Sequence, residues 1–191
     1  MDFDKVISKR KSTHSFSSKK VSWKAVLDAV DSAAQGPYAG NINHLHFIII
    51  EDPDTIEKIA KAADQSWIQN ASIVTVVMSE DVFLERLYDD RGRVYGKQSA
   101  GAAINTFILK LTDLGIGSCW VGGFDNDAVK EILDIPKKAE VEAIIPIGYD
   151  SNPGKKKTKK KVEKVIFWEG WDRWKRPAFY KEPSTHDADS T

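Results

Sequence analysis

A cluster of cations and hydroxyls lies near the N-terminus, in the run SKRKSTHSF from Ser8 to Phe16. Such a cluster suits an anion, because a terminal phosphate carries a charge of about −1.5 to −2 and each charge-assisted hydrogen bond to it contributes about 1.5 to 3 kcal/mol. Arg10 is the best candidate, since its planar guanidinium matches phosphate oxygens. The run could equally be the solvated end of a short helix over residues 2–8. The residue types alone leave both interpretations open.

A glycine pair, Gly122-Gly123, is a second place where the residue types favour a ligand. Residues without a Cβ atom let the backbone approach a flat ligand closely. The pair follows a short extended segment over residues 117–121 and precedes Asp125, which can cap a helix. A plain turn between a strand and a helix is the alternative.

The charges of the chain balance, with 28 Lys and Arg against 28 Asp and Glu, so no global field draws it to nucleic acid or to an anionic membrane. Any anion site must therefore be local. Residues 155–161 contain six lysines in seven positions, and they must be solvated or neutralised by an anion. A solvated loop or a nuclear-localisation-like patch is the alternative to a ligand site.

Composition favours a soluble cytoplasmic protein. The single cysteine, Cys119, cannot form an intramolecular disulfide, and the N-terminus lacks the apolar core of a signal peptide. No apolar run approaches the roughly 20 residues that span a bilayer. A length of 191 residues with 41 % hydrophobic residues predicts one folded domain, which we expect over residues 1–175, with a flexible tail over 176–191.

Strands and helices alternate along the chain, which predicts a layered α/β or α+β domain. Ser22 is placed to cap a helix that stops near Gly36, and the pair Asp52-Pro53 is typical of another helix start. Buried strands are expected at residues 45–50, 72–78 and 141–147, a packed central helix at 100–114, a short helix after Asp125 and a further strand at 164–168.

The segment RKSTHSF at residues 10–16 resembles the opening of the nitroreductase family, usually written R-R-S-hydrophobic-R-x-F. Four further segments follow in the family's order: AAQGPYAGNINHLHFIII, NASIVTVVM, LGIGSCWVGGFDNDAVKEILDIP, and VEAIIPIGYD with the lysine run and EKVIFW. Together they cover about residues 3–168. One such match is weak, but five in order at plausible spacing are fairly specific. The chain therefore resembles FMN-dependent NAD(P)H oxidoreductases.

This resemblance implies a nitroreductase-like mixed central sheet flanked by helices. It also implies a homodimer that exchanges its C-terminal strand and holds two FMN sites at the interface, each built from both subunits. Arg10, and less surely Lys11, would meet the phosphate or ribityl chain, and Ser12 would lie near the pyrimidine edge. His14 stands where the family usually has Arg or Lys near flavin N1 and O2.

The remaining cofactor contacts implied by the resemblance come from three other segments. Gly122 and Gly123 would bring N–H groups against N5 and O4 of the flavin. Lys159 and Lys160 match the basic pair that closes over the phosphate. The residues that would line the isoalloxazine from the other subunit are Pro37, Tyr38, Ala39 and Asn41.

The chain also departs from the family pattern. The frequent N-x-Q-P-W stretch is Asn41-Ile42-Asn43-His44-Leu45 here, and the bulky Tyr38 replaces a small hydroxyl residue. Because histidine is only partly charged near neutrality, we expect His14 to make the flavin potential depend on pH. A histidine that merely hydrogen-bonds the flavin or a neighbour is the alternative.

The expected reaction is ping-pong: NAD(P)H delivers hydride to flavin N5 and leaves, and a nitroaromatic, a quinone or another flavin takes its place. No side chain is expected to act as a catalytic acid. A specialised member of the superfamily, such as a reductive dehalogenase, and a non-catalytic flavin-binding or sensory protein are the rival hypotheses.

Several conspicuous residues are expected to be structural. Trp168, Trp171 and Trp174 recur every three residues, which predicts a helical stripe that buries apolar area. Cys119 has no obvious base beside it in sequence and is expected to be a small core residue. His44 and His46 are close in sequence but lack further ligands, so no metal site is predicted.

Overall fold

The computed structural model describes residues 1–152, 154 and 161–180. The chain divides after Gly154 into two compact units, Met1–Gly154 and Lys155–Thr191, which are described separately. No helix among the described residues is both long enough and apolar enough to cross a membrane. The expected boundaries of one domain over residues 1–175 and a tail over 176–191 stay a prediction.

The first unit is built on a sheet of four strands in the order β1-β2-β4-β3. The strands are β1 Leu45–Ile50, β2 Ile73–Ser79, β3 Gly117–Ser118 and β4 Glu140–Gly148. Every strand pair is antiparallel, and parallel pairing is confined to the single bridge between Ser12 and Ser118. The expected mixed sheet is thus almost wholly antiparallel in the described residues, which together form an α+β fold.

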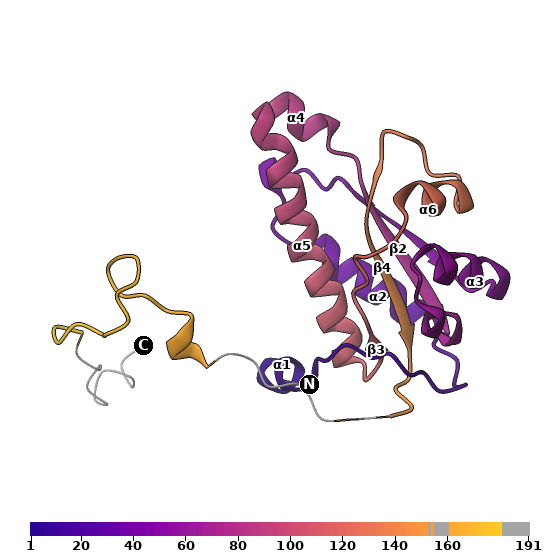
Figure 1. Ribbon diagram of the computed structural model, residues 1–191, viewed down its shortest axis with the longest axis horizontal. Coiled ribbons are helices and arrows are strands. Elements are labelled where there is room, and N and C mark those ends of the chain that lie inside the picture. Colours follow the sequence, from indigo (N-terminus) through magenta and orange to yellow (C-terminus); the bar gives the residue numbers. More distant parts are fainter. Residues whose placement is uncertain (153, 155–160, 181–191) are drawn as a thin grey trace. The chain divides into compact units, whose positions relative to one another are not determined.

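Helices cover both faces of this sheet (Figure 1). On one face, α2 Trp23–Ala34 and α5 Asp90–Asp113 pack against alternate residues of β2 and β4, with Phe107 fully buried between them and the sheet. On the other face, α3 Pro53–Ala62 and α6 Asn126–Ile132 cover the intervening residues, such as Val76 and Ile144. Alternate residues of a strand face opposite helical layers because successive side chains point to opposite sides of the sheet.

The helix starts follow their capping residues. Asp52 accepts hydrogen bonds from the backbone N–H of Thr55 at 2.9 Å and from its hydroxyl at 2.6 Å, and Pro53 occupies the first turn of α3. Asp125 accepts from the N–H of Ala128 at 3.0 Å at the start of α6. Ser22 occupies the cap position of α2 but makes no capping hydrogen bond, so only its position was predicted correctly.

The central helix α5 begins ten residues earlier than the expected start at residue 100. Its first half is polar and contains Gly92 and Gly96, which hide the helical pattern. A Cβ atom on Gly92 would lie 2.3 Å from the carbonyl oxygen of Leu84 in α4 Val82–Tyr88. The close packing of α4 and α5 therefore depends on Gly92, and the same glycine makes this part of the sequence look less helical.

In the second unit, the described residues 161–180 form a short 3₁₀ turn, Val162–Lys164, followed by irregular turns. The strand expected at 164–168 and the helical tryptophan stripe are both absent from these residues, so both predictions are wrong. Glu169 and Asp172 adopt positive φ values of 58° and 62°, which interrupt any regular helix or strand. The ring of Phe167 instead meets two tryptophans edge-on, Trp171 at 4.9 Å and Trp174 at 4.4 Å.

Candidate functional site

The predicted anion-binding run begins where α1 Phe3–Lys9 ends, because the N–H of Arg10 closes that helix on the carbonyl of Val6 at 2.9 Å. The chain then becomes extended and runs beside the segment after α5. Ser12 forms a bridge with Ser118, and the N–H of Thr13 donates to the carbonyl of Ser118 at 3.0 Å. Residues that are more than a hundred positions apart thus lie side by side.

The two neighbouring cations of this run have different surroundings. Lys11 Nζ lies 2.6 Å from Asp150 Oδ2 and also donates to the carbonyls of Asn152 and Gly154. The guanidinium of the half-buried Arg10 makes no hydrogen bond or ion pair with any residue that the structure describes. Arg10 is therefore the cation available to an anion, whereas Lys11 already has a carboxylate partner.

His14 lies against a residue that the sequence analysis treated as unrelated to the site. Its Nε2 is 3.5 Å from Sγ of Cys119, and its ring meets Trp67 edge-on at 4.7 Å. Burial raises the pKa of the Cys119 thiol, although the Ser12 hydroxyl and the charge of Arg10 oppose that rise. The thiol is thus protonated near neutrality. Cys119 is buried, as expected, but it also touches His14, a contact that no local sequence signal could reveal.

The glycine pair continues from this same segment. Val121 exchanges two backbone hydrogen bonds with Ile144, at 2.9 and 3.0 Å, and so fixes the chain just before Gly122. Gly122 and Gly123 are exposed, and their N–H groups donate to no acceptor among the described residues. A Cβ atom on either glycine would meet nothing within 4 Å. The chain therefore leaves open space and two N–H groups without an acceptor among the described residues, a few residues after Cys119, which contacts His14.

The segment Pro37–Asn41 occupies a different part of the unit. The N–H of Ala39 donates to the hydroxyl of Ser99 in α5 at 3.1 Å, and the hydroxyl of Tyr38 donates to the carbonyl of Ala33 at 3.0 Å. Burial raises the pKa of the Tyr38 phenol. The left-handed backbone at Gly40 and Asn41, with φ of 59° and 58°, exposes the tip of this turn.

The described structure brings together part of the predicted site. Arg10, Ser12 and His14 lie beside the strip from Ser118 to Gly123, whereas no described contact joins them to residues 37–41. Ser99 lies near the middle of α5, whereas Ser118 follows its C-terminal end. Because an α-helix rises 1.5 Å per residue, the 14 residues from Ser99 to Asp113 span about 20 Å. Lys159 and Lys160 lie outside the described residues.

An antiparallel sheet between two helical layers defines an α+β protein, in which the run from Arg10 to His14 lies beside Ser118 and Cys119. The chain belongs to the Nitroreductase family, whose sequence profile matches residues 7–72 and 62–149. The resemblance inferred from the sequence is thereby confirmed.

Individual relatives agree with this assignment. The chain is 29 % identical over 150 residues to a putative NADH dehydrogenase/NAD(P)H nitroreductase of Archaeoglobus fulgidus, which covers 76 % of this chain and 83 % of the relative. A nitroreductase family protein of Clostridium novyi superposes with a TM-score of 0.73 at 26 % identity, over 91 % and 96 % of the two chains. An FMN-dependent nitroreductase of Clostridium difficile superposes with a TM-score of 0.76 at 19 % identity, over 87 % and 98 %.

Proposed function

We propose that this protein is an FMN-dependent oxidoreductase that passes hydride from NADH or NADPH to a small electron acceptor. One observation carries the proposal: the half-buried guanidinium of Arg10 and the N–H groups of Gly122 and Gly123, none of which has a partner among the described residues, belong to two segments joined by the Ser12–Ser118 bridge. The names of the relatives, which include an FMN-dependent nitroreductase and NAD(P)H nitroreductases, agree with it.

The described residues fit FMN on chemical grounds. Arg10 offers an uncommitted guanidinium for the phosphate, and the two glycine N–H groups can donate to the acceptor atoms at the N5 edge of a flat ring. Ser12 and His14 add polar groups between these two ends. Lys11 is committed to Asp150, so we assign it a supporting role, in which it holds the run in place. Lys159 and Lys160 remain in the proposal as the pair that covers the phosphate.

FMN, when bound, supplies the two-electron chemistry at N5. The protein's part is to bind the flavin, to orient its N5 edge and to adjust its electronics. Gly122 and Gly123 would donate their N–H groups to the flavin and so orient its ring. His14, when protonated, stabilises negative charge near N1 and O2 through Coulomb attraction. No side chain is assigned as a catalytic acid.

A complete flavin site requires a second copy of the chain. Ala39 is held by Ser99 near the middle of α5, and the run from Arg10 passes beside Ser118 beyond the C-terminal end of that helix. A separation of about 20 Å between these anchors supports the proposal that residues 37–41 line the flavin bound by the partner subunit. Exposed apolar side chains on the first unit, including Phe3 and Trp23, suit a homodimer interface.

We further propose that the C-terminal residues extend the partner's sheet in this homodimer. Val162, Val165 and Trp171 are exposed, and Trp171 retains 87 % of its accessible surface. Such apolar surface favours contact with another protein surface.

The unpaired, buried thiol of Cys119 agrees with a reducing cytoplasmic location.

The acceptor is proposed to be a nitroaromatic, a quinone or a second flavin. Reductive dehalogenation is a second candidate, because the chain is 21 % identical over 170 residues to an iodotyrosine deiodinase of Thermotoga neapolitana. Both reactions use the same flavin edge.

Steady-state kinetics of the FMN-loaded, full-length protein test this function. We expect NADH or NADPH oxidation to depend on an added nitroaromatic or quinone, with parallel double-reciprocal lines, and we expect the protein to elute as a dimer. Turnover with an iodotyrosine alone would favour the dehalogenase. Bound FMN without any NAD(P)H oxidation would favour a non-catalytic flavin-binding protein, and failure to take up FMN would exclude both.

A further inference from the structure

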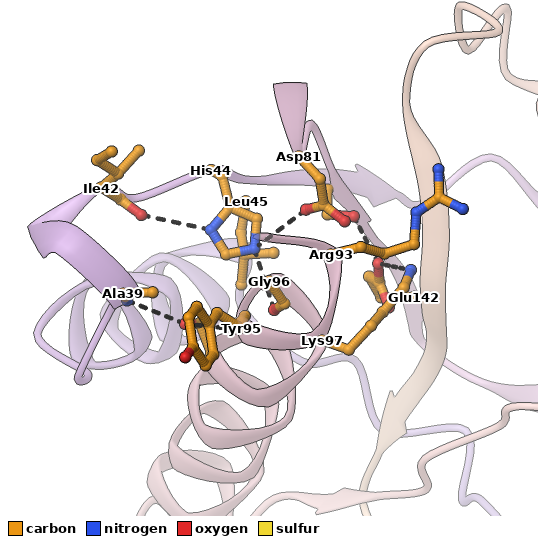
Figure 2. Close-up of polar contacts among 12 residues, drawn as sticks. Ala39, Ile42, His44, Leu45, Asp81, Arg93, Tyr95, Gly96, Lys97 and Glu142 are labelled. Atoms are coloured by element: carbon orange, nitrogen blue, oxygen red, sulfur yellow. Dashed lines mark hydrogen bonds and ion pairs between the residues drawn. The ribbon is translucent and has the colours of Figure 1, made fainter. Parts of the chain in front are cut away.

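His44, which stands in place of the proline of the family's N-x-Q-P-W stretch, is enclosed by hydrogen-bond acceptors (Figure 2). Its side chain is only 1 % exposed. Nδ1 lies 3.3 Å from the carbonyl oxygen of Ile42, and Nε2 lies 3.2 Å from the carbonyl oxygen of Gly96. Nε2 also lies 3.5 Å from Oδ1 of Asp81. Each ring nitrogen therefore faces an oxygen that can only accept a hydrogen bond.

The charge of the imidazole follows from this arrangement. A neutral imidazole has one N–H donor and one lone pair, so one of its nitrogens would face a carbonyl oxygen without a proton between them. Such a contact sets the lone pair of the nitrogen against a carbonyl oxygen inside the protein, which is repulsive. The imidazolium donates at both nitrogens and satisfies both carbonyls.

Asp81 supplies the matching negative charge. Its side chain is 11 % exposed, and Oδ1, which makes no hydrogen bond with the described residues, lies 3.5 Å from Nε2 of His44, where a protonated ring forms an ion pair with it. Burial raises the pKa of the Asp81 carboxyl, while the charges of His44 and Lys97 oppose that rise. Gly96 permits the approach, since a Cβ atom there would lie 2.6 Å from Oδ1.

A second ion pair lies beside the first. Lys97 and Ser79 both donate to Oε1 of Glu142 at 2.5 Å. With a protonated His44, the cluster of His44, Asp81, Lys97 and Glu142 contains two cations and two anions. With a neutral His44 it would carry one uncompensated negative charge beside a buried imidazole, although Lys97 itself is exposed. The phenol of Tyr38, whose ring meets the imidazole edge-on at 6.0 Å, also faces it.

We propose that His44 is a buried imidazolium which, together with Ser99, positions the segment Tyr38–Ile42 against α5. His44 holds the end of the segment at Ile42 and connects it to α5 at Gly96. Ser99 holds the middle of the segment at Ala39 and donates in turn to the carbonyl of Tyr95. The segment is thus fixed at two points to one rigid helix.

This positioning role rests on the proposed function, in which residues 37–41 line the partner subunit's flavin. The tip of the segment has left-handed backbone at two consecutive residues, Gly40 and Asn41, and such a turn keeps its shape only when neighbouring contacts hold it. A segment that is fixed before FMN binds does not have to be ordered during binding, which favours affinity. His44 and Ser99 are therefore positioning residues that touch neither flavin nor substrate.

Nitrogen NMR of the full-length protein, with ¹⁵N-labelled histidine, tests the charge. His44 is assigned by comparison with His44→Gln, and the exposed His46 serves as the control through His46→Gln. We expect both ring nitrogens of His44 to be protonated, with similar chemical shifts, at pH 7. We also expect Asp81→Asn to convert His44 to a neutral ring with widely separated shifts. A neutral His44 in the wild-type protein would overturn the proposal.

Flavin titration tests the consequence. We expect His44→Gln and Ser99→Ala each to weaken FMN binding about tenfold, as for a binding segment that must be ordered on binding, and His46→Gln to leave it unchanged. Circular dichroism checks that the variants are folded. Unchanged FMN affinity in both folded variants would contradict the positioning role. A wild-type protein that binds no FMN would contradict the proposed function, and the histidine spectrum would still decide the charge of His44.

Discussion

Replacing Arg10 by alanine distinguishes a phosphate-binding cation from an ordinary surface charge. The guanidinium of Arg10 makes no hydrogen bond or ion pair with the described part of the chain, so its removal breaks no described hydrogen bond or ion pair. Lys11 provides the matched control, because it is the adjacent cation and its ammonium already lies 2.6 Å from Asp150. The two variants remove the same formal charge from the same run.

The expected loss of FMN affinity follows from the number of hydrogen bonds between Arg10 and the phosphate. One charge-assisted hydrogen bond to phosphate contributes about 1.5 to 3 kcal/mol, which corresponds to a 10- to 150-fold change in the dissociation constant. We expect Arg10→Ala to weaken FMN binding within this range. Lys11→Ala should weaken it by a smaller factor, because the ammonium of Lys11 is already paired with Asp150 and acts on the phosphate only by holding the run in place.

Titration with FMN and with riboflavin, monitored by flavin fluorescence, measures both effects. Riboflavin lacks the phosphate, so its affinity should be the same in wild-type protein and in Arg10→Ala. Equal losses of FMN affinity in Arg10→Ala and Lys11→Ala would refute the reasoning. An equal loss of riboflavin and FMN affinity in Arg10→Ala would do so too, since it would mean that Arg10 acts on the fold or on the ring.

Three further predictions concern other parts of the molecule. Gly92→Ala places a Cβ atom 2.3 Å from the carbonyl oxygen of Leu84 and should lower the free energy of unfolding by about 1 to 3 kcal/mol, whereas the exposed Gln98→Ala should change it by less than about 0.5 kcal/mol in denaturant titrations. Because burial raises the pKa of Cys119, its alkylation at pH 8 should be slower than that of a free thiol. The folded state then binds this proton more tightly than the unfolded state, so stability should fall as the pH rises above about 8.5, and it should fall less in Cys119→Ala. His14→Arg should raise the reduction potential of bound flavin and reduce its pH dependence near neutrality, and potentiometry that detects neither change would rule out electronic tuning by His14.

The sequence predicted the elements whose signals are local. The strand over residues 45–50 has the bounds that were expected, because its apolar residues end abruptly at Glu51. Helices α3 and α6 begin after Asp52 and Asp125, whose carboxylates make the expected capping hydrogen bonds. In these places one residue determines the structure through a hydrogen bond to a residue at most four positions away, so the sequence alone shows it.

The failures arise where tertiary contacts decide the structure. The first half of α5 is stabilised by its packing on α4 through Gly92, a residue that disfavours helix in isolation. Around the tryptophans, a spacing of three residues predicted a helix, but the backbone reverses at Glu169 and Asp172. In such segments helix propensity predicts the structure poorly, and no other local pattern in the sequence indicates the structure that forms.

The candidate site was predictable in part for the same reason. The run from Arg10 to His14 and the glycine pair were found from residue types, and their proximity becomes visible only through the bridge between Ser12 and Ser118. The contact between His14 and Cys119 joins residues 105 positions apart, so it has no local signal. Likewise His44 was singled out as a departure from a family motif and for its closeness to His46, whereas its contacts with Gly96 and Asp81 have no local signal.

The central claim is that this strip holds a flavin that nicotinamide can reduce. An anaerobic titration of the FMN-loaded protein with NADH and, separately, with NADPH tests it directly. We expect the flavin absorbance to bleach at one equivalent of the preferred nucleotide per bound FMN and to return when an acceptor is added. Flavin that binds but stays oxidised with both nucleotides, or a protein that takes up no FMN, would contradict the claim.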